Sequence, residues 1–210
     1  MHSTKLYESL FILHKCQLNI DILWKMIDPS ENSSNITEQN IHLFVYHINL
    51  EAVSFLEEYN GDFLKNIEVE YHNRVKEIRK IGAPILKRIN KWKDLEKFRN
   101  NIIAHPWRNK GKFVMPGKYN IPSNLLEIAV FVNLLKYVWS MIRIEFLKEL
   151  NQAIKYIDTL KIQTTATTDY STLNEDHYNM VHEVNSLCKL LNKKYYLKVF
   201  LYDLPTTDKT

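Results

Sequence analysis

The stretch DLEKFRNNIIAHPWR occupies residues 94–108 and predicts the helix around which the rest of the chain is arranged. Asp94 is a good N-cap residue for that helix. Apolar residues then recur at the spacing of an amphipathic helix: Leu95, Phe98 and Ile102. Pro106 disfavours helical geometry in the residue before it, so the helix should end near His105.

Arg99 falls on the apolar side of this predicted helix, and His105 falls at the edge of that side, at about 100° of rotation per residue. A guanidinium that faces inward is costly unless it is paired or lines a cleft. The pattern therefore indicates either a paired core arginine or a pocket that receives both side chains. A plainer interpretation is an arginine that reaches to solvent and a histidine that favours the negative end of the helix.

The order of residues in this stretch resembles the motif of the HEPN superfamily. Arg99 is followed by the polar residue Asn100, then by residues 101–103, the small Ala104 and His105. The family motif is an arginine, usually followed by a polar residue, with a histidine after four to six intervening positions. The segment FRNNIIAH is similar to abortive-infection and toxin-type members, and the resemblance covers about a dozen residues.

The resemblance implies a compact α-helical bundle that is commonly homodimeric, and in many members a metal-independent endoribonuclease. The implied catalytic residues are Arg99, Asn100 and His105. His105 would act as general base or acid, and Arg99 would neutralise charge on the phosphoryl oxygens. The ribose 2′-OH would attack the adjacent phosphate, which leaves a 2′,3′-cyclic phosphate and a 5′-hydroxyl and makes DNA inert.

An α-helix separates Arg99 and His105 by about 120° and 9 Å. One helix therefore does not bring the two side chains together easily. Two chains packed across a twofold axis would supply both residues to a composite cleft, so a homodimer is expected.

Positive charge is concentrated in the segment that contains this helix. Residues 74–112 hold 13 Lys and Arg against three Asp and Glu, whereas the whole chain has a net charge of +4. Such a cluster is typical of a phosphate-rich partner, although helical lysines also simply solvate an exposed face. Six residues are predicted to contact RNA, possible targets being tRNA and mRNA: Lys93, Lys97, Asn101, Arg108, Lys110 and Lys112.

The composition predicts an all-α protein with ordinary solubility. The 210 residues include only 4 Gly and 6 Pro, which favours long uninterrupted helices. Cys16 and Cys188 are expected to be buried thiols.

Four glycines do not build a phosphate loop, and no Glu-x-x-His pair or zincin motif occurs, so neither a metal nor a cofactor is expected. We expect no secretory signal, no membrane association and a cytoplasmic protein, because no apolar run is judged to reach the length of a membrane span.

Apolar periodicity predicts the order of the helices. Before residue 94 they are expected at residues 5–27, 37–59, 62–80 and 85–93, with breaks at Gly61 and at Gly82 and Pro84. Residues 107–122 should form an irregular loop. One long helix should then run from Pro122 to about Leu160 as the spine of the bundle and a dimer surface.

Three regions are expected along the chain. Residues 1–162 form a HEPN-like helical bundle, residues 163–172 form a polar linker, and residues 173–210 hold one more helix and a tail. The tail segment 195–204 is rich in aromatic and β-branched residues and reads as a short strand or an extended end.

Two other functions remain open on the sequence. The chain could be a catalytically inactive HEPN-type module that binds RNA or a nucleotide, or that regulates a partner such as an antitoxin. It could also be a helical scaffold or oligomerisation protein in which the Arg99 and His105 spacing is incidental.

Overall fold

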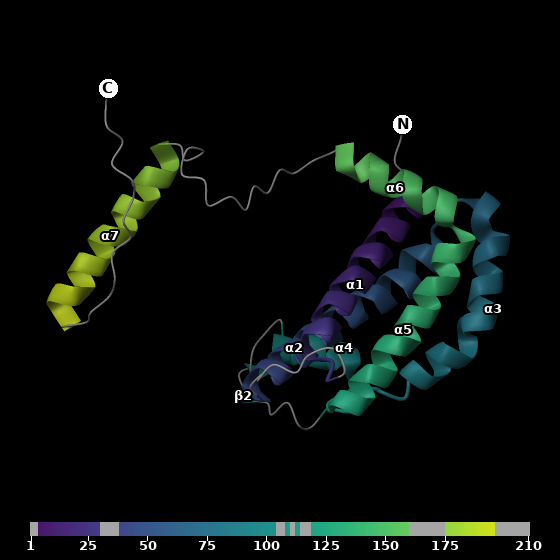
Figure 1. The fold of residues 1–210 in the computed structure, drawn as a ribbon, viewed down its shortest axis with the longest axis horizontal. Helices are drawn as coiled ribbons and strands as arrows, with labels where there is room; N and C mark the ends of the chain where they lie inside the picture. The colour runs from purple at the N-terminus through teal and green to yellow at the C-terminus, as the bar shows by residue number, and fades with distance from the viewer. Residues whose placement is uncertain are drawn as a thin grey trace. The chain divides into compact units, whose positions relative to one another are not determined.

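The computed structural model describes residues 4–29, 38–103, 108–109, 112–113, 119–159 and 175–195. The chain divides into two compact units, Met1–Lys161 and Ile162–Thr210. The first unit is a helical bundle, and the described part of the second is one helix, α7 (Glu175–Tyr195) (Figure 1). The all-α fold class is confirmed. The predicted linker at 163–172 and the tail beyond Tyr195 lie outside the described residues.

The first helix, α1 (Lys5–Ile27), has the bounds that the sequence predicts. Thr4 caps it, because its hydroxyl accepts a hydrogen bond from the backbone N–H of Tyr7 at 3.2 Å. The carboxylate of Glu68 accepts the free N–H groups of Lys5 and Leu6 at 2.8 and 3.3 Å. A negative group at a helix N-terminus is stabilising, so this contact fixes the start of α1 against a distant part of the chain.

The predicted break at Gly61 is present as a kink with non-helical backbone angles, whereas the helix start predicted at Asp62 is wrong, because the next long helix begins at His72. Helix α2 (Glu38–Glu58) continues into a π-helical turn, η1 (Tyr59–Phe63), which carries a kink at Gly61. Tyr59 and Phe63 are fully buried and their rings stack with centroids 5.8 Å apart. The gain from keeping both rings in the core offsets the irregular backbone. Thr37, at which this helix was expected to begin, lies outside the described residues.

Helix α3 (His72–Ile89) follows a short 3-10 turn, η2 (Val69–Tyr71), and runs without interruption through Gly82 and Pro84. The predicted break there, and the separate helix at 85–93, are therefore wrong. Gly82 is buried, and a Cβ on it would lie 3.2 Å from the Met141 side chain, so the glycine permits close packing. Pro84 is exposed, which lets water satisfy the carbonyl that its missing N–H leaves free.

The predicted single helix from Pro122 to Leu160 is broken in two. Helix α5 (Leu125–Glu145) is capped by Asn124, whose side chain accepts from the Glu127 N–H at 3.0 Å. The chain leaves helical geometry at Phe146, and α6 (Leu147–Thr159) follows. The two helices lie at a clear angle, and α6 crosses the N-terminal end of α1 (Figure 1).

The break is held by the contacts of Phe146. This side chain is fully buried and meets the rings of Phe63 and Tyr71 edge-on, with centroids 5.8 and 6.1 Å away. The Arg74 guanidinium lies 4.0 Å from the centre of the Phe146 ring. Arg74 also donates to the backbone carbonyl of Glu145 and so satisfies a carbonyl at the end of α5.

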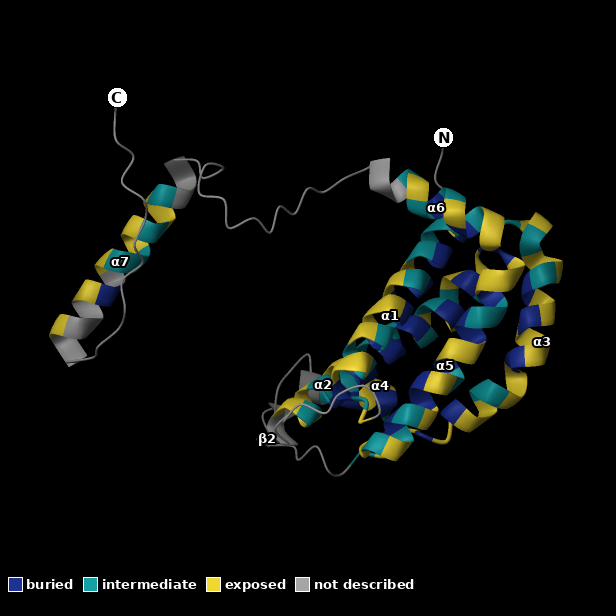
Figure 2. Ribbon diagram, in the orientation of Figure 1, coloured by how far each residue is buried: buried dark blue, intermediate teal, exposed yellow. Residues whose placement is uncertain are grey.

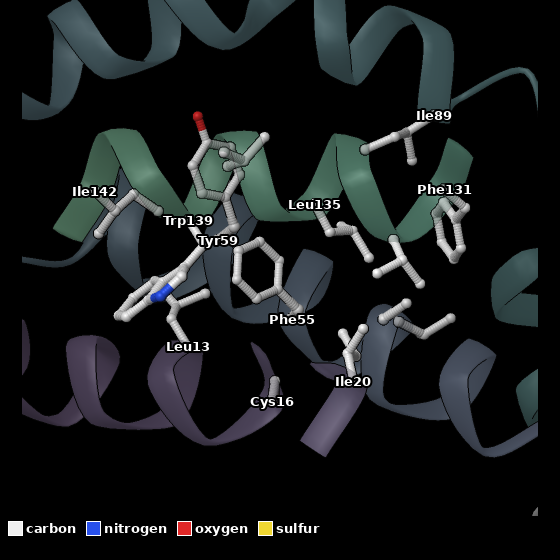
Figure 3. Close-up of a cluster of buried hydrophobic side chains, with 14 of the residues drawn as sticks. Leu13, Cys16, Ile20, Phe55, Tyr59, Ile89, Phe131, Leu135, Trp139 and Ile142 are labelled. Carbon is white, nitrogen blue, oxygen red and sulfur yellow. The ribbon is translucent and has the colours of Figure 1, made fainter. Parts of the chain in front are cut away.

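The core lies where α1, α2 and α5 meet, with α3 on the far side of α5. Buried residues lie along the inner faces of all four helices (Figure 2). Figure 3 shows Leu13 and Ile20 of α1 close to Phe55 of α2 and to Leu135 and Trp139 of α5. Cys16 lies in the same cluster and Cys188 is buried in α7, as expected. Burial raises the pKa of the Cys16 thiol to about 12, and the neighbouring Glu51 carboxylate adds to the effect.

Helix α5 is apolar on more than its buried face. By length and composition alone it is long and apolar enough to cross a membrane, so the expectation that no such run exists is wrong by that measure. The core helix of a soluble protein meets the same criterion, and the inner face of α5 is buried in the bundle. The structure is therefore compatible with a soluble protein. Its outer face exposes Leu126, Tyr137 and Ile144.

Truncation of Phe146 should weaken the bundle strongly. Phe146→Ala removes a fully buried ring at the α5–α6 junction, and we expect the free energy of unfolding to fall by about 3–5 kcal/mol. Urea denaturation followed by circular dichroism measures it. Ile144→Ala, two residues earlier and 79% exposed, is the control and should change stability by less than about 0.5 kcal/mol. Equal effects of the two variants would contradict this account.

Acid should release part of the stability held at Glu149. Its partial burial acts to raise the pKa of this carboxyl, but hydrogen bonds from Arg74 and its own backbone outweigh burial and leave the pKa below the ordinary value. A carboxyl with a lowered folded-state pKa stabilises the fold above its unfolded pKa, and that contribution is lost as the pH falls through the folded value.

Glu149→Gln should therefore reduce stability at pH 7 and flatten its loss between pH 5 and about 3, measured by urea denaturation across that range. Glu96→Gln, at an exposed carboxylate on α4 (Leu95–Phe98), is the control and should leave the acid profile close to that of the wild type. An unchanged profile for Glu149→Gln would refute the role of this carboxylate.

Candidate functional site

The predicted helix of residues 94–105 consists of two different turns. An α-helical turn, α4 (Leu95–Phe98), leads directly into a π-helical turn, η3 (Arg99–Ile103). The α-helical spacing of about 100° per residue therefore does not hold across the motif. His105, which the sequence places at the end of this helix, lies outside the described residues.

Phe98 anchors this helix to the bundle. It is fully buried, and it packs edge-on against Tyr46 of α2 and Tyr119, with ring centroids 5.2 and 5.6 Å away. Leu95 is buried beside it. These contacts fix the residues immediately before Arg99, so the position of the arginine backbone follows from core packing.

Asp94 acts differently from the prediction. It precedes α4, but its side chain does not cap the helix. Its carboxylate instead accepts from the Asn120 N–H at 3.0 Å and from Lys97 Nζ at 3.2 Å. The Asn120 hydrogen bond, followed by Lys97, holds the pKa of Asp94 below its usual range. The Asp94 N–H donates back to the Asn120 carbonyl at 3.2 Å. This reciprocal pair ties the end of the 107–122 segment to the start of the helix.

Arg99 is half-buried and paired. Its guanidinium donates to the Glu57 carboxylate of α2 through Nη1 and to the Asn100 side-chain oxygen through Nε, the latter at 3.1 Å. The Arg99 side chain is 22% exposed and that of Glu57 is 47% exposed. The sequence allowed either a paired, inward-facing arginine, a pocket shared with His105 or an arginine that reaches to solvent. The structure has a half-buried arginine paired with a carboxylate. Nothing in the sequence near Arg99 indicates Glu57, which is 42 residues earlier.

Asn101 is held by the loop that follows. Its amide donates to the Tyr119 hydroxyl at 3.2 Å, and both side chains are half-buried. Tyr119 packs against Phe98 and accepts the hydrogen bond from Asn101. The predicted role of Asn101 as an RNA contact is untested by this geometry, but one of its donors is already used.

The predicted RNA-contacting cations are only partly described. Lys93 and Lys97 are exposed, and Lys97 pairs with Asp94. Arg108 and Lys112 occupy the two short strands β1 (Arg108–Asn109) and β2 (Lys112–Phe113), which pair antiparallel. Lys110 lies outside the described residues. Among the described side chains, the structure brings Arg99, Asn100 and Glu57 together.

No metal centre is apparent in the part of the chain that the structure describes. No group of three or more His, Cys, Asp or Glu side chains there is arranged to hold a metal ion. Comparisons with protein-family models, with curated proteins and with solved structures find no significant match to this chain. The site therefore has to be interpreted from its own residues.

The Arg99–Glu57 ion pair should contribute modestly to stability. A double-mutant cycle of Arg99→Gln and Glu57→Gln should give a coupling energy of about 0.5–1 kcal/mol, because both side chains are partly exposed and screened by solvent. Urea denaturation at low and high salt measures it, and the coupling should shrink as salt rises. The same cycle on the exposed Lys5 and Glu8 pair is the control and should give less. A coupling near zero at low salt would contradict the pairing.

Proposed function

We propose that this chain is a HEPN-type, metal-independent endoribonuclease that cleaves RNA by attack of the ribose 2′-OH and works in the cytoplasm, in phage defence or as a toxin. One observation carries the proposal. Arg99 is fixed half-buried between Glu57 and Asn100 in a π-helical turn, six residues before His105 in the sequence. π-Helical turns within helices occur frequently at functional sites.

In this proposal each residue of the motif has a separate task. Arg99 neutralises the charge that develops on the phosphoryl oxygens, and His105 moves the proton of the 2′-OH or of the leaving oxygen. Asn100 holds the Arg99 guanidinium through its side-chain oxygen. No step requires a metal ion, since the nucleophile is part of the substrate.

Glu57 holds the Arg99 guanidinium in place before RNA binds. An arginine has five N–H donors, and the bonds to Glu57 and Asn100 use Nη1 and Nε. The Nη2 group remains to donate to a phosphate oxygen. Glu57 would thus orient the guanidinium while the same guanidinium binds the phosphate. Glu57 is thus a positioning residue that the sequence analysis missed.

The expected partner besides RNA is a second copy of the chain. The outer face of α5 exposes apolar residues at helical spacing, and a twofold dimer would bury this face symmetrically. These residues are Leu126, Val130, Tyr137 and Ile144. An antitoxin or other regulatory protein remains a further proposed partner.

A non-catalytic RNA-binding module is the second candidate function. The ion pair with Glu57 favours it, because an arginine already neutralised by a carboxylate stabilises a transition state less than a free one. This alternative keeps the basic surface and predicts binding without turnover.

Cleavage of RNA in EDTA tests the proposal. Purified wild type should cut total RNA and tRNA and leave 2′,3′-cyclic phosphate ends, whereas His105→Ala and Arg99→Ala should lose activity by at least about 100-fold. His47→Ala, an exposed histidine on α2, is the matched control and should cleave like the wild type. An all-deoxy substrate should remain intact.

The other outcomes separate the remaining interpretations. Equal cleavage by wild type and His105→Ala would reject the assignment of the catalytic histidine. RNA binding that weakens with salt, without any cleavage, would favour the binding module. If the protein neither binds nor cleaves RNA, the remaining interpretation is a helical scaffold or oligomerisation protein.

A further inference from the structure

Two neighbouring cavities lie beside the π-helical turn η1 and share Asn60 and Asn90 in their linings. The first, of about 490 Å³, lies between α2 and the segment that leads into α4. The second, of about 470 Å³, lies between η1 and α3. Both volumes are in the range of small-molecule sites in proteins. The shared asparagines make the two cavities adjacent parts of one surface feature.

The second cavity is strongly basic. Its lining includes Lys65, Arg79 and Lys87 and no acidic residue. All three cations are exposed, and none has an ion-pair partner within the described residues. Three like charges around one depression repel one another, and an anion would relieve that repulsion. Amide groups of the two shared asparagines add neutral donors at its edge.

The first cavity has a different chemistry. Its walls are mainly apolar, with Leu56, Leu95 and the largely buried Trp92. Its polar lining consists of the carboxylates of Glu57 and Glu96, the ammonium group of Lys93 and the two shared asparagines. An apolar space with a few amide and carboxylate groups suits a planar heterocycle that has both N–H donors and ring acceptors.

We propose that the paired cavities bind a nucleoside phosphate, with the base in the first cavity and the phosphate on Lys65, Arg79 and Lys87 in the second. The adjacent apolar and basic cavities match the two ends of such a ligand. A nucleotide joins a planar base to an anionic phosphate through a sugar of a few ångströms. This site is separate from the Arg99 turn in its phosphate-binding residues, and it does not rest on the proposed ribonuclease activity.

Calorimetric titration of the full chain in EDTA tests the site with three probes. These are ADP, adenosine and inorganic pyrophosphate. Because only ADP occupies both cavities, it should bind at least about tenfold more tightly than either of the other two. Pyrophosphate binding as tight as ADP binding would overturn the nucleotide assignment, and so would an absence of ADP binding at millimolar concentration.

Two double variants with the same net charge distinguish a specific binding site from nonspecific electrostatic attraction of the ligand. Arg79→Gln with Lys87→Gln removes two lining cations, and ADP should bind at least about tenfold more weakly. Lys76→Gln with Lys80→Gln removes two exposed cations of the same helix that do not line the cavity, and the affinity should change less than about twofold. Circular dichroism should show both variants folded. Equal losses in the two variants would overturn the proposal.

A phosphorylated RNA end presents the same chemistry as a free nucleotide. A short 2′-O-methyl oligonucleotide, which lacks the 2′-OH nucleophile, should be titrated with a 5′-phosphate and with a 5′-hydroxyl. Preference for the 5′-phosphate form that is lost in Arg79→Gln with Lys87→Gln assigns the site to RNA ends. Preference for ADP over both oligonucleotides assigns it to free nucleotides. Because no probe can be cleaved, the outcome is independent of ribonuclease activity.

Discussion

The burial of one face of α5 is the constraint on which the rest of the bundle depends. Residues at helical spacing along this face are almost completely inaccessible, and they contact α1 on one side and α3 on the other. α3 approaches closely because Gly82 has no side chain where it meets Met141. The need to keep Phe146 in the same core then ends α5 and turns the chain into α6. Packing thus determines both the straight and the broken parts of the fold.

The candidate site is attached to this core through Phe98. Its ring is fixed between Tyr46 and Tyr119, so the next residue, Arg99, leaves the core at a defined place and reaches Glu57. The Asp94 carboxylate and the Asn120 backbone hold the following loop against the start of the same helix. An arginine that would be costly to bury alone is therefore tolerated, because a carboxylate from a neighbouring helix meets it.

The basic segment of residues 74–112 does several things at once. Arg74 is used in the fold, where it bonds Glu145 and Glu149 and covers the Phe146 ring. Arg88 lies 4.2 Å from the centre of the Trp92 ring, and Lys97 pairs with Asp94. The net charge of a segment therefore overstates the charge available to a phosphate-rich partner. The exposed cations of α3 that line a cavity, Arg79 and Lys87, are among those left for such a ligand.

The sequence by itself determined the helical class, the bounds of α1, the burial of Cys16 and Cys188, and the existence of an amphipathic helix ahead of Pro106. These features follow from residue spacing over one or two turns, which a single chain displays directly. Only the tertiary structure decided that Gly82 and Pro84 do not end a helix, that Phe146 does, and that Glu57 pairs with Arg99. Those outcomes depend on contacts between residues distant in the sequence, 42 positions apart for Glu57 and Arg99, where burial of a ring or pairing of a charge outweighs local propensity.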